Sequence, residues 1–338
     1  MDPLKPYNEL TPISELNIVE TKQLMKTVEE TRVAIELLNY EVSKLPSPGI
    51  LLDTLVLQEA KASSNIENIV TTNDDLYKGI LFDSFTAEAK EVSDYKAGLF
   101  AGYESLGVKE LLSVGDIENI NRHVNGRQHG LRSNLPNFEG SFTRIANVVS
   151  GKTEILYTPP HGKELLNKLL LDMLEFVYND ELYPIHPLIK ISLAHYQFES
   201  IHPFYDGNGR TGRILNILFL CQKKYLSHPV LYASSFIIKN KTDYYKLLQN
   251  CRQEDNYTPF IEYMLQSFQT TAQKTLAVVN EIQRLIKNYS DEKFLSTMKG
   301  HDKVIQSVIN VVFEKVYVRI DDLVTILGLH RQTAASYL

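Results

Sequence analysis

Within the twelve residues from His202 to Arg213, the chain holds a histidine, a carboxylate, three glycines and two arginines. Because the unperturbed pKa of histidine lies close to neutrality, a neutral His202 can take a proton near pH 7. Asp206 offers a hard oxygen ligand of the kind that Mg²⁺ uses together with substrate phosphates. A plain turn needs glycine or asparagine but not this combination. The run therefore predicts a compact site for a phosphorylated ligand.

The glycines and arginines of the run favour a polyphosphate over a single phosphate. Gly207 and Gly209 can adopt backbone conformations closed to other residues, so that successive N–H groups turn toward one anion. Apolar spacing without proline predicts a helix from near Arg210 to Lys223, with its positive end at the same place. Arg210 and Arg213 share one face of that helix, where their planar guanidinium groups can bind phosphate oxygens bidentately.

Two other phosphate-binding motifs do not fit the run. Residues 207–212 satisfy the loose GxGxxG pattern, but a dinucleotide site also needs a preceding strand and an acidic residue roughly 20 positions later. The preceding segment Pro187–Ile201 has helical apolar spacing, and no Asp or Glu occurs between Arg213 and Asp243. No Gly-Lys-Ser/Thr follows either, which excludes a Walker phosphate loop.

The spacing of His195, Glu199 and His202 on one helix resembles a metal triad. Pro203 would end that helix near His202, which is also the histidine best placed for proton transfer. We therefore expect His195 to be packed and hydrogen-bonded instead of binding a metal.

Residues 202–213 resemble the signature HxFx(D/E)GNGRxxR of the Fic family, with every specified position filled. The resemblance implies a helical domain that binds ATP with Mg²⁺ and transfers AMP to a Ser, Thr or Tyr hydroxyl of a protein, itself included, with release of pyrophosphate. It implies that His202 deprotonates the target hydroxyl, that Phe204 anchors the loop and that Asp206 holds the metal ion. The nucleotide contacts it implies are Gly207, Asn208, Gly209, Arg210, Thr211, Gly212 and Arg213, with His202 beside them.

A second segment, residues 63–68, resembles the inhibitory motif (S/T)xxxE(G/N) that precedes the Fic core in many family members. The resemblance implies that Glu67 forms a salt bridge with Arg213 and blocks the productive position of the γ-phosphate. A carboxylate and a guanidinium make a geometrically specific pair. The resemblance thus implies a nucleotide site that contains Glu67 and is restrained by it.

Two further segments resemble the borders of the Fic nucleotide pocket. Residues 147–160 have β-rich flanks around a turn, as a hairpin has, and resemble the Fic flap, with Val148, Val149, Ser150 and Gly151 as its expected residues. Such a hairpin aligns a target segment by strand pairing, although a hairpin that only packs fits the same pattern. Tyr244 and Tyr245 match a position that lines the adenine pocket. Adjacent helical residues face different ways, so we expect only one of them there.

The predicted fold is mainly α: a Fic helical core with a small β-hairpin flap, an N-terminal helical region and a partial C-terminal winged helix. With 338 residues and 43% hydrophobic content, several units are expected. The predicted divisions are a helical region with the inhibitory motif at 1–110, the core at 111–275, and a linker with a tail at 276–338. Helices are expected over Glu20–Val42 and Leu51–Glu67.

Composition points to a cytoplasmic protein. Cys221 and Cys251 stand in apolar or helical surroundings without metal-ligand partners, as buried thiols do. The N-terminus lacks a basic region followed by an apolar run, and no stretch is long enough for a membrane span. A net charge of −6 argues against general binding to nucleic acids.

The tail offers a different class of function. Helices expected over Val304–Val316, over Asp321–Leu327 and from His330 onward resemble a shortened winged helix-turn-helix, which would place a helix in a DNA groove. From Glu281 onward the chain has eight basic and seven acidic residues, so protein docking or a homodimer competes with DNA binding. The alternatives are an ATP-sensing DNA-binding regulator, a Fic enzyme with another donor, and an enzyme that removes AMP.

Overall fold

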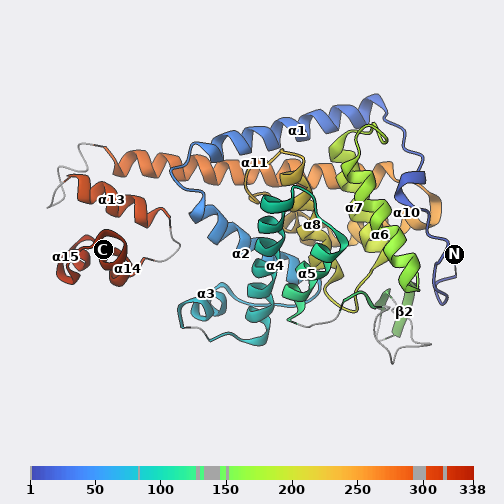
Figure 1. Cartoon of the computed structure of the whole chain (residues 1–338), viewed down its shortest axis with the longest axis horizontal. Helices are drawn as coiled ribbons and strands as arrows, with labels where there is room; N and C mark the ends of the chain where they lie inside the picture. Colours follow the sequence, from blue (N-terminus) through green and yellow to red (C-terminus); the bar gives the residue numbers. More distant parts are fainter. Residues whose placement is uncertain are drawn as a thin grey trace.

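The chain folds into a mainly helical protein, as the sequence predicts (Figure 1). The computed structural model describes residues 2–82, 84–126, 130–132, 145–149, 152–291, 302–314 and 318–338. The helices and strands are α1 (Lys22–Ser43), α2 (Gly49–Ile66), α3 (Asn73–Phe82), α4 (Ala87–Lys109), α5 (Val114–Asn125), β1 (Ile145–Val149), β2 (Lys152–Tyr157), α6 (Lys163–Tyr178), α7 (Pro187–Ile201), α8 (Asn208–Gln222), α9 (Ser234–Ile237), α10 (Lys241–Glu254), α11 (Thr258–Tyr289), α13 (Asp302–Val312), α14 (Ile320–Leu327) and α15 (Arg331–Tyr337).

Two long helices, α1 and α11, run side by side along one edge of the molecule (Figure 1). Helix α1 begins at Lys22 because the Thr21 hydroxyl accepts the N–H of Leu24 at 3.1 Å, as a capping residue does. The Thr31 hydroxyl donates to the carbonyl of Leu265 at 3.3 Å inside the contact between the helices. The expected helix over 20–42 is thus present, with its N-terminus set by the cap.

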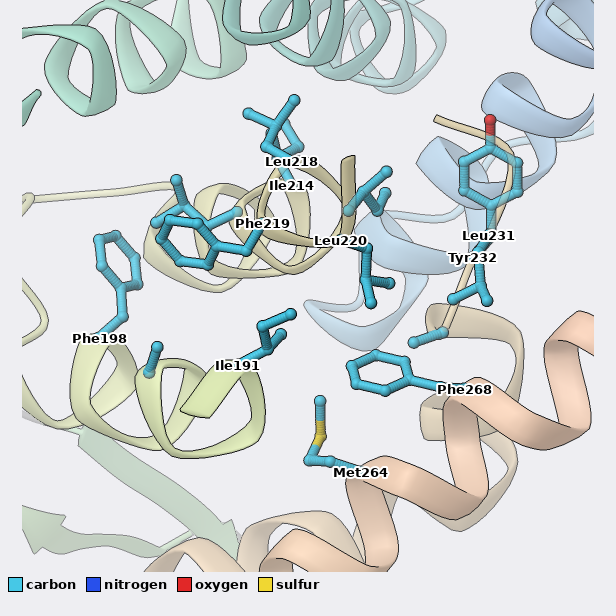
Figure 2. Packing of buried hydrophobic residues seen from close by; sticks show 14 of the residues in the cluster. Ile191, Phe198, Ile214, Leu218, Phe219, Leu220, Leu231, Tyr232, Met264 and Phe268 are labelled. Atoms are coloured by element: carbon cyan, nitrogen blue, oxygen red, sulfur yellow. The ribbon is translucent and has the colours of Figure 1, made fainter. Parts of the chain in front are cut away.

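Helix α7 lies at the centre of the core and positions the histidine of the motif. It begins with Pro187, whose fixed φ suits the first turn of a helix, and every residue from Leu188 to Ile201 is buried. Ile191 and Phe198 of α7 face apolar side chains of α8 and α11, which include Phe219 and Phe268 (Figure 2). A helix buried on all sides holds its ends in fixed positions.

Beside α7, the short β-hairpin pairs β1 with β2 in antiparallel register, with Val149 opposite Lys152. The hairpin is therefore present where the sequence predicts a flap. Of the expected flap residues, Val148 and Val149 lie in β1, whereas Ser150 and Gly151 lie outside the described residues.

At the C-terminal end, α13, α14 and α15 surround a small apolar core of their own, formed by Val308, Val311, Leu323 and Ala334. Gly328, with φ +65°, turns the chain between α14 and α15. The predicted boundary at 275 falls inside α11, which continues to Tyr289. The winged-helix assignment of this tail stays a prediction.

Within the described ranges, none of the helices is both long and apolar enough to traverse a bilayer.

Candidate active site

The loop between α7 and α8 is held closed by its own side chains. His202 ends α7 in the left-handed region (φ 48°), and its N–H donates to the carbonyl of Phe198 at 2.9 Å. The side-chain amide of Asn208 accepts the N–H of Phe204 and donates to the carbonyl of the same residue, each at 2.8 Å. Phe204 itself is buried against Phe198. The asparagine of the motif thus fixes the loop with its side chain.

Two arginines and a tyrosine bind the last carbonyls of α7, which a helix leaves without intrahelical partners. Arg132 Nε donates to the carbonyl of His202 at 2.8 Å, and the Tyr157 hydroxyl donates to that of Ser200 at 3.0 Å. Arg252 donates to the carbonyl of Glu199 at 3.3 Å. Tyr157 ends β2 of the hairpin and Arg252 lies in α10. The base of the hairpin and α10 therefore both support the end of α7 that carries His202.

This environment keeps the imidazole of His202 neutral. Burial, together with the charges of Arg132 and Arg252, lowers its pKa to about 3, while a backbone interaction with Glu199 opposes the change. A neutral ring has a nitrogen lone pair that can accept a proton. His202 therefore has the protonation state that a general base needs, although its basicity without a ligand is low.

Asp206 stands at the open side of the loop. One carboxylate oxygen accepts the N–H of Gly207 at 2.7 Å, and the side chain is 54% exposed. The backbone carbonyl of Asp206 accepts from the amides of Asn121 at 3.0 Å and Asn125 at 2.7 Å, both on α5. Gly207 has φ +72°, and a Cβ there would lie 2.4 Å from Asn125 Oδ1, so only glycine fits. The α5 asparagines thus set the direction of the loop just before α8.

A single carboxylate bridges both arginines of α8. Glu67, at the C-terminal end of α2, lies 2.7 Å from Arg213 Nη2 through one oxygen and 3.2 Å from Arg210 Nε through the other. Arg213 also donates from Nε to the Ser63 hydroxyl at 2.7 Å. A Cβ at Gly209 would lie 2.5 Å from Glu67, so this glycine lets the carboxylate approach α8. Burial would lower the pKa of Arg213, but the charge of Glu67 raises it above its usual value.

The remaining residues of the motif divide into those at the exposed first turn of α8 and those that face the protein interior. The N–H groups of Asn208, Gly209 and Arg210, at the first turn of α8, have no intrahelical partners. Thr211 and Gly212 are buried: the Thr211 hydroxyl accepts from Asn121 at 3.1 Å, and a Cβ at Gly212 would lie 2.8 Å from Glu199. Of the predicted nucleotide contacts, these two support α8 from the protein interior.

A cavity of about 670 Å³ opens beside Glu67, and its size falls within the range of small-molecule sites. Helix α10 and the hairpin form its walls, and its lining includes Ile66, Ile145, Leu156, Lys241, Tyr245 and Gln249. Tyr245 is 42% exposed and faces this cavity, whereas Tyr244 is buried with its hydroxyl 2.8 Å from His195 Nε2. As expected for adjacent helical residues, only one of the two tyrosines lines the cavity.

His195 is a buried core residue. Its Nε2 lies against Tyr244 and its Nδ1 lies 3.1 Å from Asn216 Nδ2. Burial lowers the pKa of His195 to about 3. In the part of the chain that the structure describes, no three His, Cys, Asp or Glu side chains are grouped as metal ligands. The expectation that His195 is packed and hydrogen-bonded is therefore confirmed.

Several residues of the site were not predicted from the sequence. Arg132, Asn121 and Asn125 contact the loop, Arg252 contacts the end of α7, and Glu91 of α4 lies 2.7 Å from Arg210 Nη1. All of these contacts join residues more than 50 positions apart in the chain. A local pattern carries no signal for such contacts, because each depends on how distant helices pack.

Two family descriptions match the chain. Residues 25–104 match "Fic/DOC family N-terminal" and residues 111–220 match "Fic/DOC family". Together the two matches cover more than half of the 338 residues; the first ends within α4 and the second begins just before α5.

Curated relatives and solved structures agree with these matches. The chain is 26% identical over 182 residues to "Protein adenylyltransferase fic-1" of Caenorhabditis elegans, and 28% identical over 202 residues to "Protein adenylyltransferase Fic" of Drosophila mojavensis. These matches cover 54% and 58% of this chain but only 32% and 36% of the relatives, so the similarity spans about a third of their length. A crystal structure of a Fic family protein from Desulfovibrio desulfuricans has a similar fold, with a TM-score of 0.62 at 23% identity, over 94% of this chain and 88% of that one.

Proposed function

Because this chain belongs to the Fic/DOC family, we propose that it transfers AMP from ATP to a Ser, Thr or Tyr hydroxyl of a protein and that Glu67 restrains this activity. Pyrophosphate is the second product. The observation that carries the proposal is the Glu67 carboxylate, which occupies the donors of Arg210 and Arg213 beside the first turn of α8. Helix N-termini and paired guanidinium groups suit phosphates, so the same donors suit the β- and γ-phosphates of ATP.

The chemical step needs a base, a held phosphate chain and a free path to the α-phosphorus. His202 takes the proton of the target hydroxyl, whose oxygen forms a bond to the α-phosphorus while the bond to the β-phosphate oxygen breaks. The N–H groups at the start of α8 and the two arginines orient the triphosphate and balance the charge of the leaving pyrophosphate. Bound phosphates bring negative charge near His202, which raises the low pKa of its ring toward a useful value.

The donor set suits Mg²⁺ bound together with ATP. Asp206 presents an exposed carboxylate at the mouth of the loop, and Mg²⁺ is commonly held by one or two carboxylates plus substrate phosphates. Asp206 would hold the ion, and the ion would neutralise phosphate charge. The exposed Tyr245 and the apolar side chains of Ile66 and Leu156 in the cavity suit the adenine ring.

The first experiment compares wild type, Glu67→Gly, His202→Ala and the double variant Glu67→Gly/His202→Ala with Mg²⁺ and either α-labelled or γ-labelled ATP. We expect covalent label from the α position only, raised at least tenfold in Glu67→Gly and absent in Glu67→Gly/His202→Ala, because the first change frees Arg213 and the second removes the base. Covalent label is measured on the protein itself and on proteins of a lysate.

Glu110→Gly is the matched control. Glu110 also follows the C-terminus of a helix, α4, and already has the left-handed φ of 64° that glycine tolerates. The Glu110→Gly substitution therefore removes the same charge as Glu67→Gly from the same kind of position, but away from the loop. Label that rises equally in Glu110→Gly and Glu67→Gly would contradict restraint by Glu67. ATP binding without any covalent label in Glu67→Gly would contradict AMP transfer and favour the nucleotide-sensing alternative.

A further inference from the structure

Arg210 is bound from two sides, and only one of them belongs to the site. Its side chain is 2% exposed. Nε reaches Glu67 at 3.2 Å, and Nη2 reaches Asn125 Oδ1 at 3.3 Å with Asp206 at 3.6 Å. On the other side, Nη1 donates to Glu91 at 2.7 Å and to the carbonyl of Val124 at 3.4 Å. The edge with Nε and Nη2 therefore faces the site residues, and Nη1 is held by α4 and α5.

The two carboxylates that pair with Arg210 lie on different elements of the protein. A buried guanidinium is costly unless a carboxylate compensates it. Two carboxylates, Glu67 and Glu91, are hydrogen-bonded to it, but they come from different elements. Glu67 projects from the C-terminus of α2, whereas Glu91 lies within α4, which packs directly on α8 (Figure 1). When a phosphate replaces Glu67, Glu91 is the carboxylate that still holds the guanidinium.

We propose that Glu91 is a positioning residue: it holds Nη1 of Arg210 so that the Nε and Nη2 edge faces the β-phosphate of the nucleotide. This inference rests on the proposed function, because the β-phosphate is the ligand that Arg210 would bind there. A guanidinium binds phosphate best through two parallel N–H groups, which requires its plane to be fixed. The 2.7 Å contact fixes that plane from the side opposite to the phosphate. Glu91 therefore acts on nucleotides that have a β-phosphate and not on AMP.

The test measures the binding of ATP and of AMP by calorimetry, with Mg²⁺, in the Glu67→Gly protein and in the same protein with Glu91→Gln. Glutamine keeps the shape of the side chain but removes its charge. Loss of one charge-assisted hydrogen bond predicts that the Kd for ATP rises by about tenfold or more. The Kd for AMP changes less than about twofold, since AMP lacks the phosphate that Arg210 would contact.

Two further variants separate positioning from a general structural effect. Glu88→Gln removes an exposed carboxylate from the same helix one turn away, and both Kd values should stay as they are. Glu91→Asp keeps the charge but places the carboxylate farther from Arg210. This variant should recover part of the ATP affinity. If Glu91→Gln does not fold, Glu91→Asp still has to weaken ATP more than AMP.

Two results would overturn the proposal. An equal loss of affinity for ATP and AMP means that Glu91 only supports the fold, and tighter ATP binding means that Glu91 competes with phosphate as Glu67 does. Binding does not require turnover, so this result is independent of whether label is transferred. Absence of AMP transfer with a selective loss of ATP affinity would refute the proposed function and retain the role of Glu91.

Discussion

At the residue scale, the two arginines of α8 have to satisfy two requirements that oppose each other. The guanidinium group suits phosphate, but a buried guanidinium such as that of Arg213 is costly without a carboxylate. The Glu67 carboxylate compensates the charge of Arg213, and it thereby occupies the N–H donors that a phosphate would need. Ser63, on the same helix, accepts from Nε of Arg213 and so keeps its side chain in place. One residue therefore stabilises the ligand-free protein at the position where a phosphate would bind.

A prediction at this scale concerns the titration of His202. Because burial and two arginines lower its pKa to about 3, the ring should stay neutral from pH 8 down to pH 5 in the protein without nucleotide. Its ring-proton NMR resonance, identified as the one lost in His202→Ala, should not shift over that range. A titration midpoint above pH 5.5 would contradict this environment, since an exposed histidine titrates near pH 6.5.

At the scale of elements, the site is the junction of α7 and α8 held by its neighbours. The carbonyls at the end of α7 are bound by Arg132, Tyr157 and Arg252. Since Tyr157 ends β2, the hairpin is joined directly to the end of α7 that carries His202. The protein thus connects the surface next to the cavity with the group that would accept the proton.

A stability prediction belongs to α7. Glu199 is 8% exposed, and burial raises its pKa to about 7, with the charge of Arg213 opposing the change. The folded protein therefore keeps this proton longer than the unfolded chain does. The free energy of unfolding should fall as pH rises from about 4.5 to about 7, by up to about 3 kcal/mol from this group.

Glu199→Gln isolates the effect. The free energy of unfolding of the variant minus that of wild type should increase between pH 5 and pH 8, as denaturant unfolding at several pH values can measure. His195 and His202, with pKa values lowered to about 3, give the opposite slope, but they do so in both proteins. Glu164→Gln, on the exposed side of α6, is the control for loss of a carboxylate. A difference that stays flat with pH would contradict the raised pKa.

Elements with strong local signals were predictable from the sequence. Helix α7 has the predicted bounds because Pro187 begins it and Pro203 follows its last turn. Helix α8 begins at Asn208, two residues before the prediction, because Gly207 adopts the left-handed conformation directly before it. The helices on either side of the motif thus follow from proline, glycine and apolar spacing.

Contacts between distant elements were not predictable in this way. The proximity of Glu67 to Arg213 was expected only from a family resemblance, and nothing in the sequence pointed to Glu91 or Arg132. These contacts depend on the packing of α2 and α4 against α8, and of the residues before the hairpin against the end of α7. Local spacing does not encode that packing, and side-chain type alone does not select one arginine partner among many carboxylates.

At the scale of the whole molecule, the apolar core is divided in two. The large cluster joins helices α1 to α11, and the small one belongs to α13, α14 and α15. A unit as small as the second rarely buries enough apolar surface to be stable alone. It contacts the larger part through Phe313, whose ring lies 6.2 Å from that of Tyr289 and near Ile282 and Ile286 of α11.

The stability of the tail should therefore depend on this contact, while the site should not. Phe313→Ala removes the ring that joins α13 to α11, so amide exchange in α13, α14 and α15 should become at least about tenfold faster. Exchange in α7 and α8 should remain the same, because the large core is complete without the tail. Hydrogen exchange measured by mass spectrometry resolves the two regions, and Val312→Ala, at the more exposed neighbouring position that ends α13, is the matched control. Faster exchange in α7 or α8 would mean that the tail supports the site, and unchanged exchange in the tail would mean that its own core suffices.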